Sequence, residues 1–121
     1  MSEPAPERAE AEGTAVCGVD EIGPGQAREF VVGEWRVLVC NVGGELYAVE
    51  DVCPHDRGPL GQGRLRGAVI ECPRHGARFD VRDGSVKAPP AVRPVPCLPV
   101  RVVDGQVTVV AVGSPTRRSP R

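Results

Sequence analysis

Two short clusters of cysteine and histidine hold the residue types that could do chemistry in this chain. Cys53-Pro54-His55 and Cys72-Pro73-Arg74-His75 each offer one thiol and one imidazole, and sixteen residues separate His55 from Cys72. These two histidines are the only ones in the 121-residue sequence, and each follows a cysteine by two or three positions. Thiolates and imidazoles are common ligands of transition metals. The paired pattern therefore predicts a metal site made of Cys53, His55, Cys72 and His75.

The grouping of these four residues bears on which metal they would bind. Zinc fingers usually pair cysteine with cysteine and histidine with histidine, as C-x2-4-C followed by H-x3-5-H. Here each cluster is mixed, which suits a two-iron centre with both thiolates on one iron and both imidazoles on the other. A tetrahedral zinc bound by the same four residues stays open as an alternative.

The residues around the two clusters resemble the Rieske motif of soluble ferredoxins. Gly58-Pro59-Leu60 follows the first cluster, and Gly76 and then Phe79-Asp80 follow the second. The resemblance covers residues 14–112 and implies one Rieske-type 2Fe-2S cluster. It places Cys53 and Cys72 on one iron and His55 and His75 on the other, with the two histidines at an exposed tip.

The remaining pattern predicts an all-β chain. Short apolar runs alternate with turn residues, and no stretch of ten residues shows helical periodicity. We expect strands over residues 14–19, 30–32, 35–40, 45–49, 69–72, 78–81, 98–103 and 106–112. Leu46, Ala48 and Val49 should supply the buried side of the fourth strand. Asp104-Gly105 between the last two runs is a strong hairpin signal.

These elements predict an antiparallel β-sandwich with an inserted subdomain at about residues 51–90. The resemblance implies that the sandwich is of the Rieske type and that the inserted subdomain binds the cluster. The domain should span residues 14–112. The segments 1–13 and 113–121 are expected to be disordered tails, because they contain few residues that could be buried. By resemblance, the stretch 88–91 (Ala-Pro-Pro-Ala) would be a proline loop that covers one side of the cluster; a simple linker is the alternative.

Composition and charge limit the classes of partner. The net charge is -1, but residues 51–121 carry twelve Lys or Arg against six acids, so the half with the metal ligands is basic. No dense basic run contains aromatic residues, so we expect no nucleic-acid binding. Lacking a signal peptide and an apolar span, the protein is expected in the cytoplasm and without membrane attachment. Cys17, Cys40 and Cys97 should then be reduced thiols, with Cys40 in the core. A monomer is expected as the simplest state for a diffusing protein.

Two features of high-potential Rieske proteins are missing from this chain, and their absence predicts a low reduction potential. The resemblance implies that Gly58 and Arg74 stand at two positions where Rieske proteins of cytochrome bc complexes have cysteines that form a disulfide. These proteins also have hydroxyl donors to the cluster sulfurs at the positions of Ala77 and Phe79. This chain has neither feature.

A low potential suits a one-electron carrier between an NAD(P)H-dependent flavoprotein reductase and a terminal Rieske oxygenase. The chain should not be an enzyme itself, because no histidine remains for the second, mononuclear iron of an oxygenase. Arg57, Arg64, Arg66, Arg74 and Arg78 could steer an acidic partner toward the site, or could simply keep the protein soluble.

Two other functions stay open at this point. The first is the small Rieske-like subunit of an assimilatory NADH nitrite reductase, although the presence of all four ligand residues favours the ferredoxin. The second is a zinc-stabilised interaction module, which would be colourless.

Overall fold

The computed structural model describes residues 13–89, 93–113 and 115, and the regular structure in these residues is almost entirely β. Val19–Glu21 forms a short 3-10 helix. The strands are β1 (Thr14–Gly18), β2 (Ala27–Val32), β3 (Trp35–Val42), β4 (Glu45–Glu50), β5 (Arg64–Arg66), β6 (Val69–Glu71), β7 (Arg78–Asp80), β8 (Val86–Ala88), β9 (Cys97–Leu98), β10 (Val100–Val103) and β11 (Gln106–Val109). Most of the two expected tails, and residues 90 and 91 of the proline stretch, lie outside the described residues.

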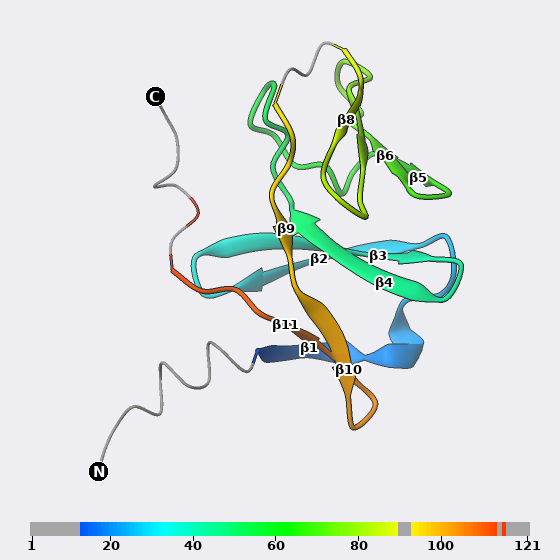
Figure 1. Cartoon of the computed structure of the whole chain (residues 1–121), viewed down its shortest axis with the longest axis vertical. Helices are drawn as coiled ribbons and strands as arrows, with labels where there is room; N and C mark the ends of the chain where they lie inside the picture. Colours follow the sequence, from blue (N-terminus) through cyan, green and yellow to red (C-terminus); the bar gives the residue numbers. More distant parts are fainter. Residues whose placement is uncertain (1–12, 90–92, 114, 116–121) are drawn as a thin grey trace.

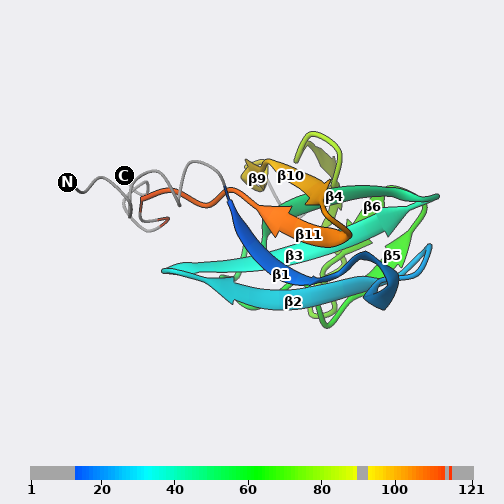
Figure 2. The same cartoon turned by 90° about the horizontal axis from the view of Figure 1, so that it is seen from below.

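The strands form three antiparallel sheets (Figure 1). The outer sheet has the order β1-β11-β10, the central sheet β2-β3-β4-β9, and the cluster sheet β5-β6-β7-β8. Figure 2 shows the outer sheet stacked on the central sheet. The cluster sheet lies at the other side of the central sheet, at one end of the molecule. This architecture confirms the all-β sandwich with an inserted subdomain.

The central sheet is buried on both faces. Val37, Val39 and Ala48 pack into the core shared with the outer sheet. Leu38, Cys40 and Val49 pack into the core shared with the cluster sheet. Successive residues of a strand point to opposite faces, so a continuous apolar run such as Val37 to Cys40 is typical of a strand covered on both sides. The sequence predicted one buried side for β4, whereas Ala48 and Val49 are buried on opposite faces.

The last hairpin closes the sandwich as expected. β10 and β11 pair around Asp104-Gly105, and β11 continues the ladder to β1. The predicted strand 98–103 is split, because Pro99 has no N–H to donate to a ladder. As a result Leu98 pairs with Ala48 in the central sheet, while Val100 begins the pairing with β11 in the outer sheet.

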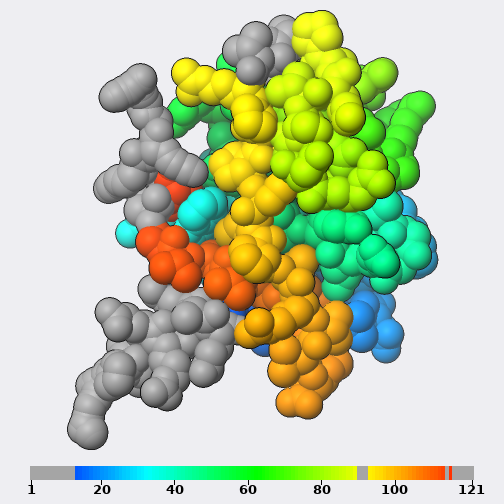
Figure 3. All heavy atoms as spheres, viewed as in Figure 1, coloured from blue at the N-terminus to red at the C-terminus, as the bar shows by residue number. Residues whose placement is uncertain are grey.

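Residues 93–98 lead the chain back from the cluster sheet to the sandwich. Figure 3 shows this segment running down the face of the molecule from the cluster sheet to the outer sheet. The Val95 N–H donates to the Gly84 carbonyl oxygen at 2.9 Å. Gly84 has a φ of +80°, and a Cβ at that position would lie 2.0 Å from the Val95 carbonyl oxygen. The turn after β7 therefore requires glycine in order to dock on this segment.

Among the described residues, no helix is long and apolar enough to cross a membrane.

Candidate metal centre

The two cysteine–histidine clusters lie on two loops with the same backbone hydrogen bonds. In loop 1 (residues 53–61) the Cys53 N–H donates to the Gly58 carbonyl and the Arg57 N–H donates to the Cys53 carbonyl, both at 2.7 Å. In loop 2 (residues 72–77) the Cys72 N–H donates to the Ala77 carbonyl at 2.7 Å. The Gly76 N–H there donates to the Cys72 carbonyl at 3.1 Å. In each loop, both the N–H and the carbonyl oxygen of the cysteine are thus hydrogen-bonded to later residues of the same loop.

The fifth residue of each loop has a left-handed backbone. Arg57 has a φ of 68° and Gly76 a φ of 81°. Glycine adopts this conformation without strain, whereas arginine does not. The repeated geometry explains why one Cys-x-His box and one Cys-x2-His box can present their ligands to the same place.

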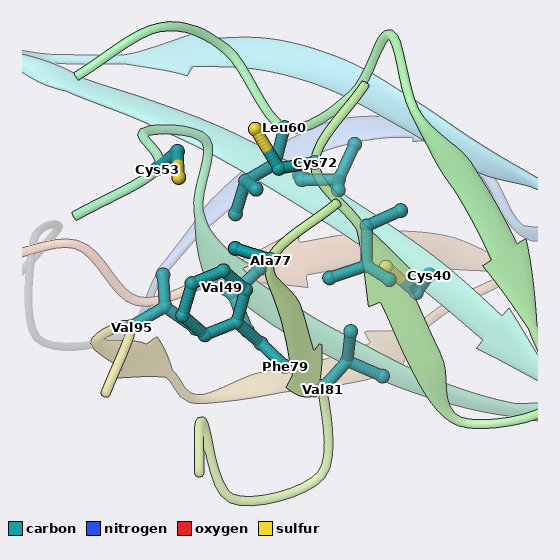
Figure 4. Packing of buried hydrophobic residues seen from close by; sticks show 11 residues of the cluster. Cys40, Val49, Cys53, Leu60, Cys72, Ala77, Phe79, Val81 and Val95 are labelled. Carbon is teal, nitrogen blue, oxygen red and sulfur yellow. The ribbon is translucent and has the colours of Figure 1, made fainter. Parts of the chain in front are cut away.

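The two cysteine sulfurs lie close together inside one hydrophobic core. The exposed fractions of Cys53 and Cys72 are 0% and 1%, and both thiols are free. Figure 4 shows the two side chains above Ala77 and the ring of Phe79. All four belong to the hydrophobic core that also contains Leu60 and Val95. The Cys53 and Cys72 ligand atoms and a carboxylate oxygen of Asp56 all lie within 4.8 Å of one another.

The two imidazoles are paired on the solvent side. His55 and His75 are exposed, and their ring centroids are 4.9 Å apart with an interplanar angle of 87°. All four predicted site residues are therefore brought together, the thiols inside and the imidazoles outside. This arrangement offers a thiol pair to one metal ion and an imidazole pair to another.

The surroundings of Cys53 favour metal binding by its thiolate. Burial is the main cause that raises the pKa of the Cys53 thiol, while the backbone N–H groups of Asp56 and His55, which hydrogen-bond to the sulfur, oppose this shift. A buried thiolate needs a compensating positive charge, and a metal ion displaces the thiol proton when it binds. The N–H groups directed at the sulfur would then stabilise the bound thiolate.

Asp56 and Arg74 form an ion pair across the two loops, which sequence analysis did not identify. The Arg74 Nε donates to Asp56 Oδ2, and Nη2 donates to Asp56 Oδ1 at 3.0 Å. Arg74 holds the pKa of the Asp56 carboxyl well below its ordinary value. The Asp56 carboxylate also lies 3.4 Å from His75 Nδ1. The available signal was the presence of opposite charges inside the two boxes, but charge alone does not indicate which residues pair.

Sequence analysis also did not identify Asp51, which fixes loop 1 to the central sheet. Its Oδ1 accepts hydrogen bonds from the Leu60 N–H at 2.9 Å and the Gly61 N–H at 2.7 Å. Burial and the neighbouring Glu29 raise the pKa of Asp51 to about 7, although the two N–H donors act in the opposite direction. The Glu29 side chain packs so closely on Gly61 that a Cβ there would lie 2.4 Å from Glu29 Cγ.

The donor set fits a cluster with mixed thiolate and imidazole ligation, and comparison with known proteins decides the family. The model of the Rieske [2Fe-2S] domain matches residues 12–99. The chain is a member of the Rieske family. It therefore binds one Rieske-type 2Fe-2S cluster, as its sequence predicted, and the zinc module is not supported.

Relatives of this Rieske protein include ferredoxins of aromatic dioxygenase systems. The ferredoxin component of biphenyl 2,3-dioxygenase from Rhodococcus jostii (strain RHA1) is 39% identical over 103 residues, which are 85% of this chain and 96% of that protein. The ferredoxin of carbazole 1,9a-dioxygenase from Nocardioides aromaticivorans IC177 has a TM-score of 0.78 at 34% identity. That match covers 81% of this chain and 96% of the other.

A further solved structure contains both a ferredoxin and its oxygenase. The complex of reduced oxygenase and oxidized ferredoxin in carbazole 1,9a-dioxygenase includes a chain with a TM-score of 0.76 at 38% identity. The match covers 80% of this chain and 91% of that chain. These relatives favour the ferredoxin over the nitrite reductase subunit.

Proposed function

We propose that this Rieske protein is the ferredoxin of a multicomponent oxygenase and carries single electrons to the terminal oxygenase. The observation that supports this most strongly is the pairing of two buried thiols with two exposed imidazoles on matching loops. The ferredoxin relatives support the same function. The bound cluster would supply the chemistry, since a 2Fe-2S centre accepts and releases one electron.

Each ligand residue has a proposed role. Cys53 and Cys72 would hold the iron on the core side, where the apolar cluster excludes water from their sulfurs. His55 and His75 would hold the outer iron through one ring nitrogen each. Their exposed rings would then form the shortest path for an electron between the site and a partner protein. This division of roles follows from burial, because the thiols are enclosed and the imidazoles are not.

The same comparison supports an oxygenase partner. The carbazole dioxygenase complex is one of an oxygenase with a ferredoxin, and we infer an equivalent oxygenase partner for this chain. The electron donor would be an NAD(P)H-dependent flavoprotein reductase. We expect the carrier to act as a monomer in the cytoplasm and to catalyse no reaction on a substrate, since both histidines are used as cluster ligands.

The surroundings of the thiols favour a low reduction potential. Ala77 and Phe79 are fully buried beside Cys72, and neither has a hydroxyl to donate to a cluster sulfur. Hydrogen bonds to sulfur raise the potential of an iron–sulfur centre because they stabilise the extra negative charge of the reduced state. We expect a midpoint near the lower end of the Rieske range, roughly -150 mV.

An absorption spectrum and an electrode titration of the purified protein test this function. A red-brown protein that bleaches with dithionite and titrates as a one-electron couple near the lower end of the range is expected. A colourless protein with one bound zinc would contradict the electron-carrier function. A midpoint well above zero would contradict the low-potential assignment and the inferred donor.

A further inference from the structure

The two ligand loops have no covalent link, and a side-chain ion pair joins them instead. Besides the two hydrogen bonds to the Asp56 carboxylate, Arg74 Nη1 donates to the Pro59 carbonyl oxygen at 3.0 Å. One guanidinium of loop 2 therefore holds a side chain and a backbone carbonyl of loop 1. A planar guanidinium that bonds both oxygens of one carboxylate fixes orientation as well as distance.

Gly58 makes room for this contact. A Cβ built on Gly58 would lie 2.6 Å from Arg74 Cζ and 2.8 Å from both Nε and Nη2. The guanidinium thus lies directly against the Gly58 backbone. Gly58 does not have a positive φ, so its backbone does not require glycine; the adjacent guanidinium does.

Asp56 is held in place from within its own loop. Its Oδ1 accepts the Gly58 N–H at 3.0 Å, in addition to the bond from Arg74. The exposed fractions of the Asp56 and Arg74 side chains are 16% and 31%. Because water is partly excluded, this pair is stronger than an ion pair at the open surface.

We propose that Arg74 and Asp56 are positioning residues that hold the two ligand loops at the spacing the cluster needs. High-potential Rieske proteins are expected to have a disulfide at the positions of Gly58 and Arg74; here the Arg74 guanidinium lies against Gly58 and pairs with Asp56 of the same loop. The ion pair joins the two loops without a disulfide, so thiol reductants do not break this link. This inference rests on the proposed ligand set of Cys53, His55, Cys72 and His75.

The first test measures how fast the loaded protein loses its visible absorption in the presence of an iron chelator. Arg74→Gln is expected to lose its cluster about tenfold faster than the wild type, as is typical when a residue that supports a metal ligand is removed. Arg74→Lys, which keeps the charge but cannot bond both oxygens, should lie between the two. Arg78→Gln is the matched control, since Arg78 follows loop 2 and pairs with Glu71 at 3.9 Å. Its rate should match that of the wild type.

A double variant separates geometry from charge. Arg74→Gln alone removes a positive charge near the site, and the reduction potential should fall. Asp56→Asn with Arg74→Gln restores the net charge, so the potential should return toward the wild-type value while cluster loss stays fast. If the double variant retained its cluster as well as the wild type, the effect would be one of charge, and the positioning role would be wrong.

A covalent replacement gives the decisive comparison. Gly58→Cys with Arg74→Cys is expected to restore slow cluster loss under oxidising conditions and to lose that protection when a thiol reductant is added. Wild-type retention should not respond to the reductant. Slow loss in Arg74→Gln would overturn the inference. A wild type that binds no cluster would overturn the proposed function itself.

Discussion

Two apolar residues beside Cys72, Ala77 and Phe79 (Figure 4), are expected to influence the reduction potential of the site. Ala77 closes loop 2 through its carbonyl oxygen and is fully buried beside Phe79. The sequence identified both positions because each lacks an expected hydroxyl, and the structure places both in the same apolar cluster as the two cysteines.

Ala77→Ser should raise the reduction potential. A charge-assisted hydrogen bond contributes about 1.5 kcal/mol, which corresponds to a shift on the order of 60 mV for a one-electron couple. An electrode titration measures the shift. Ala77→Val adds bulk without a donor and serves as the control. An equal rise in both variants would show that the hydroxyl is not the cause.

The left-handed residues of the two loops predict opposite effects of substitution on stability. Gly76→Ala should lower the free energy of unfolding by roughly 1 kcal/mol, because alanine is strained at a φ of 81°. Arg57→Gly should raise it by roughly 0.5 kcal/mol, because relief of strain exceeds the added chain entropy of glycine. Denaturant titration of the loaded protein measures both. A loss of stability in Arg57→Gly would contradict the strain argument.

At the scale of elements, the sequence predicted long apolar strands well and short polar ones poorly. β1 and the β2–β3 and β10–β11 hairpins lie where apolar runs and glycine turns indicated. The three-residue strands β6 and β7 were predicted, whereas β5 (Arg64–Arg66) and β8 (Val86–Ala88) were not, because each alternates charged and apolar residues and gains its ladder only from neighbouring strands of the cluster sheet. Tertiary pairing, rather than local propensity, makes them strands.

The four proposed ligand residues stand out in the sequence for a different reason. Their residue types and spacing carry the signal directly, and the structure brings all four together. Asp51, Asp56 and Arg74 could not be predicted, because their partners depend on how separate loops meet. Leu60 and Gly61 donate to Asp51 across nine and ten residues, and Arg74 reaches Asp56 across eighteen.

The attachment of loop 1 to the central sheet should depend on pH through Asp51. Its pKa in the folded protein is about 7 against an ordinary 3.8, so the folded state binds more protons between these values. Stability from this group is present below about pH 4 and is lost as the pH rises through 7. Asp51→Asn keeps an acceptor for the two N–H donors and cannot ionise.

Melting temperatures of the loaded wild type and Asp51→Asn should therefore diverge from pH 5 to pH 8. The wild type should lose stability relative to the variant as the pH rises. Parallel curves would show that Asp51 does not titrate in this range.

Over the whole molecule, positive charge gathers on one side of the cluster sheet. We call Arg64, Arg66, Arg78 and Lys87 the basic face, and together with Val69 and Glu71 they line a groove of about 340 Å³. Arg64, Glu71 and Arg78 are aligned across β5, β6 and β7. A second groove of about 520 Å³ shares three of these arginines and reaches Cys72 and Pro73. Of the five arginines that the sequence suggested for steering, Arg74 is instead bound to Asp56.

Removing charge from the basic face should slow the approach of anions. The reduced double variant Arg64→Gln with Arg66→Gln should react with ferricyanide several-fold more slowly than the wild type at low ionic strength, and equally fast at high ionic strength. Stopped-flow absorbance measures the rates, and hexaammineruthenium(III), a cation, serves as the oxidant of opposite charge. Arg28→Gln with Arg101→Gln makes the same change in net charge on the other sheets. Equal slowing by both pairs would show that net charge, not the basic face, controls the rate.

The central claim is that two cysteines and both histidines of this chain hold the cluster of an electron carrier. Pulsed electron paramagnetic resonance of the dithionite-reduced protein, prepared with 15N-labelled histidine, tests it most directly. We expect couplings from two distinct histidine nitrogens, and loss of the signal in variants of His55 or His75. A reduced cluster with no histidine nitrogen coupling, or with coupling to one histidine alone, would contradict it.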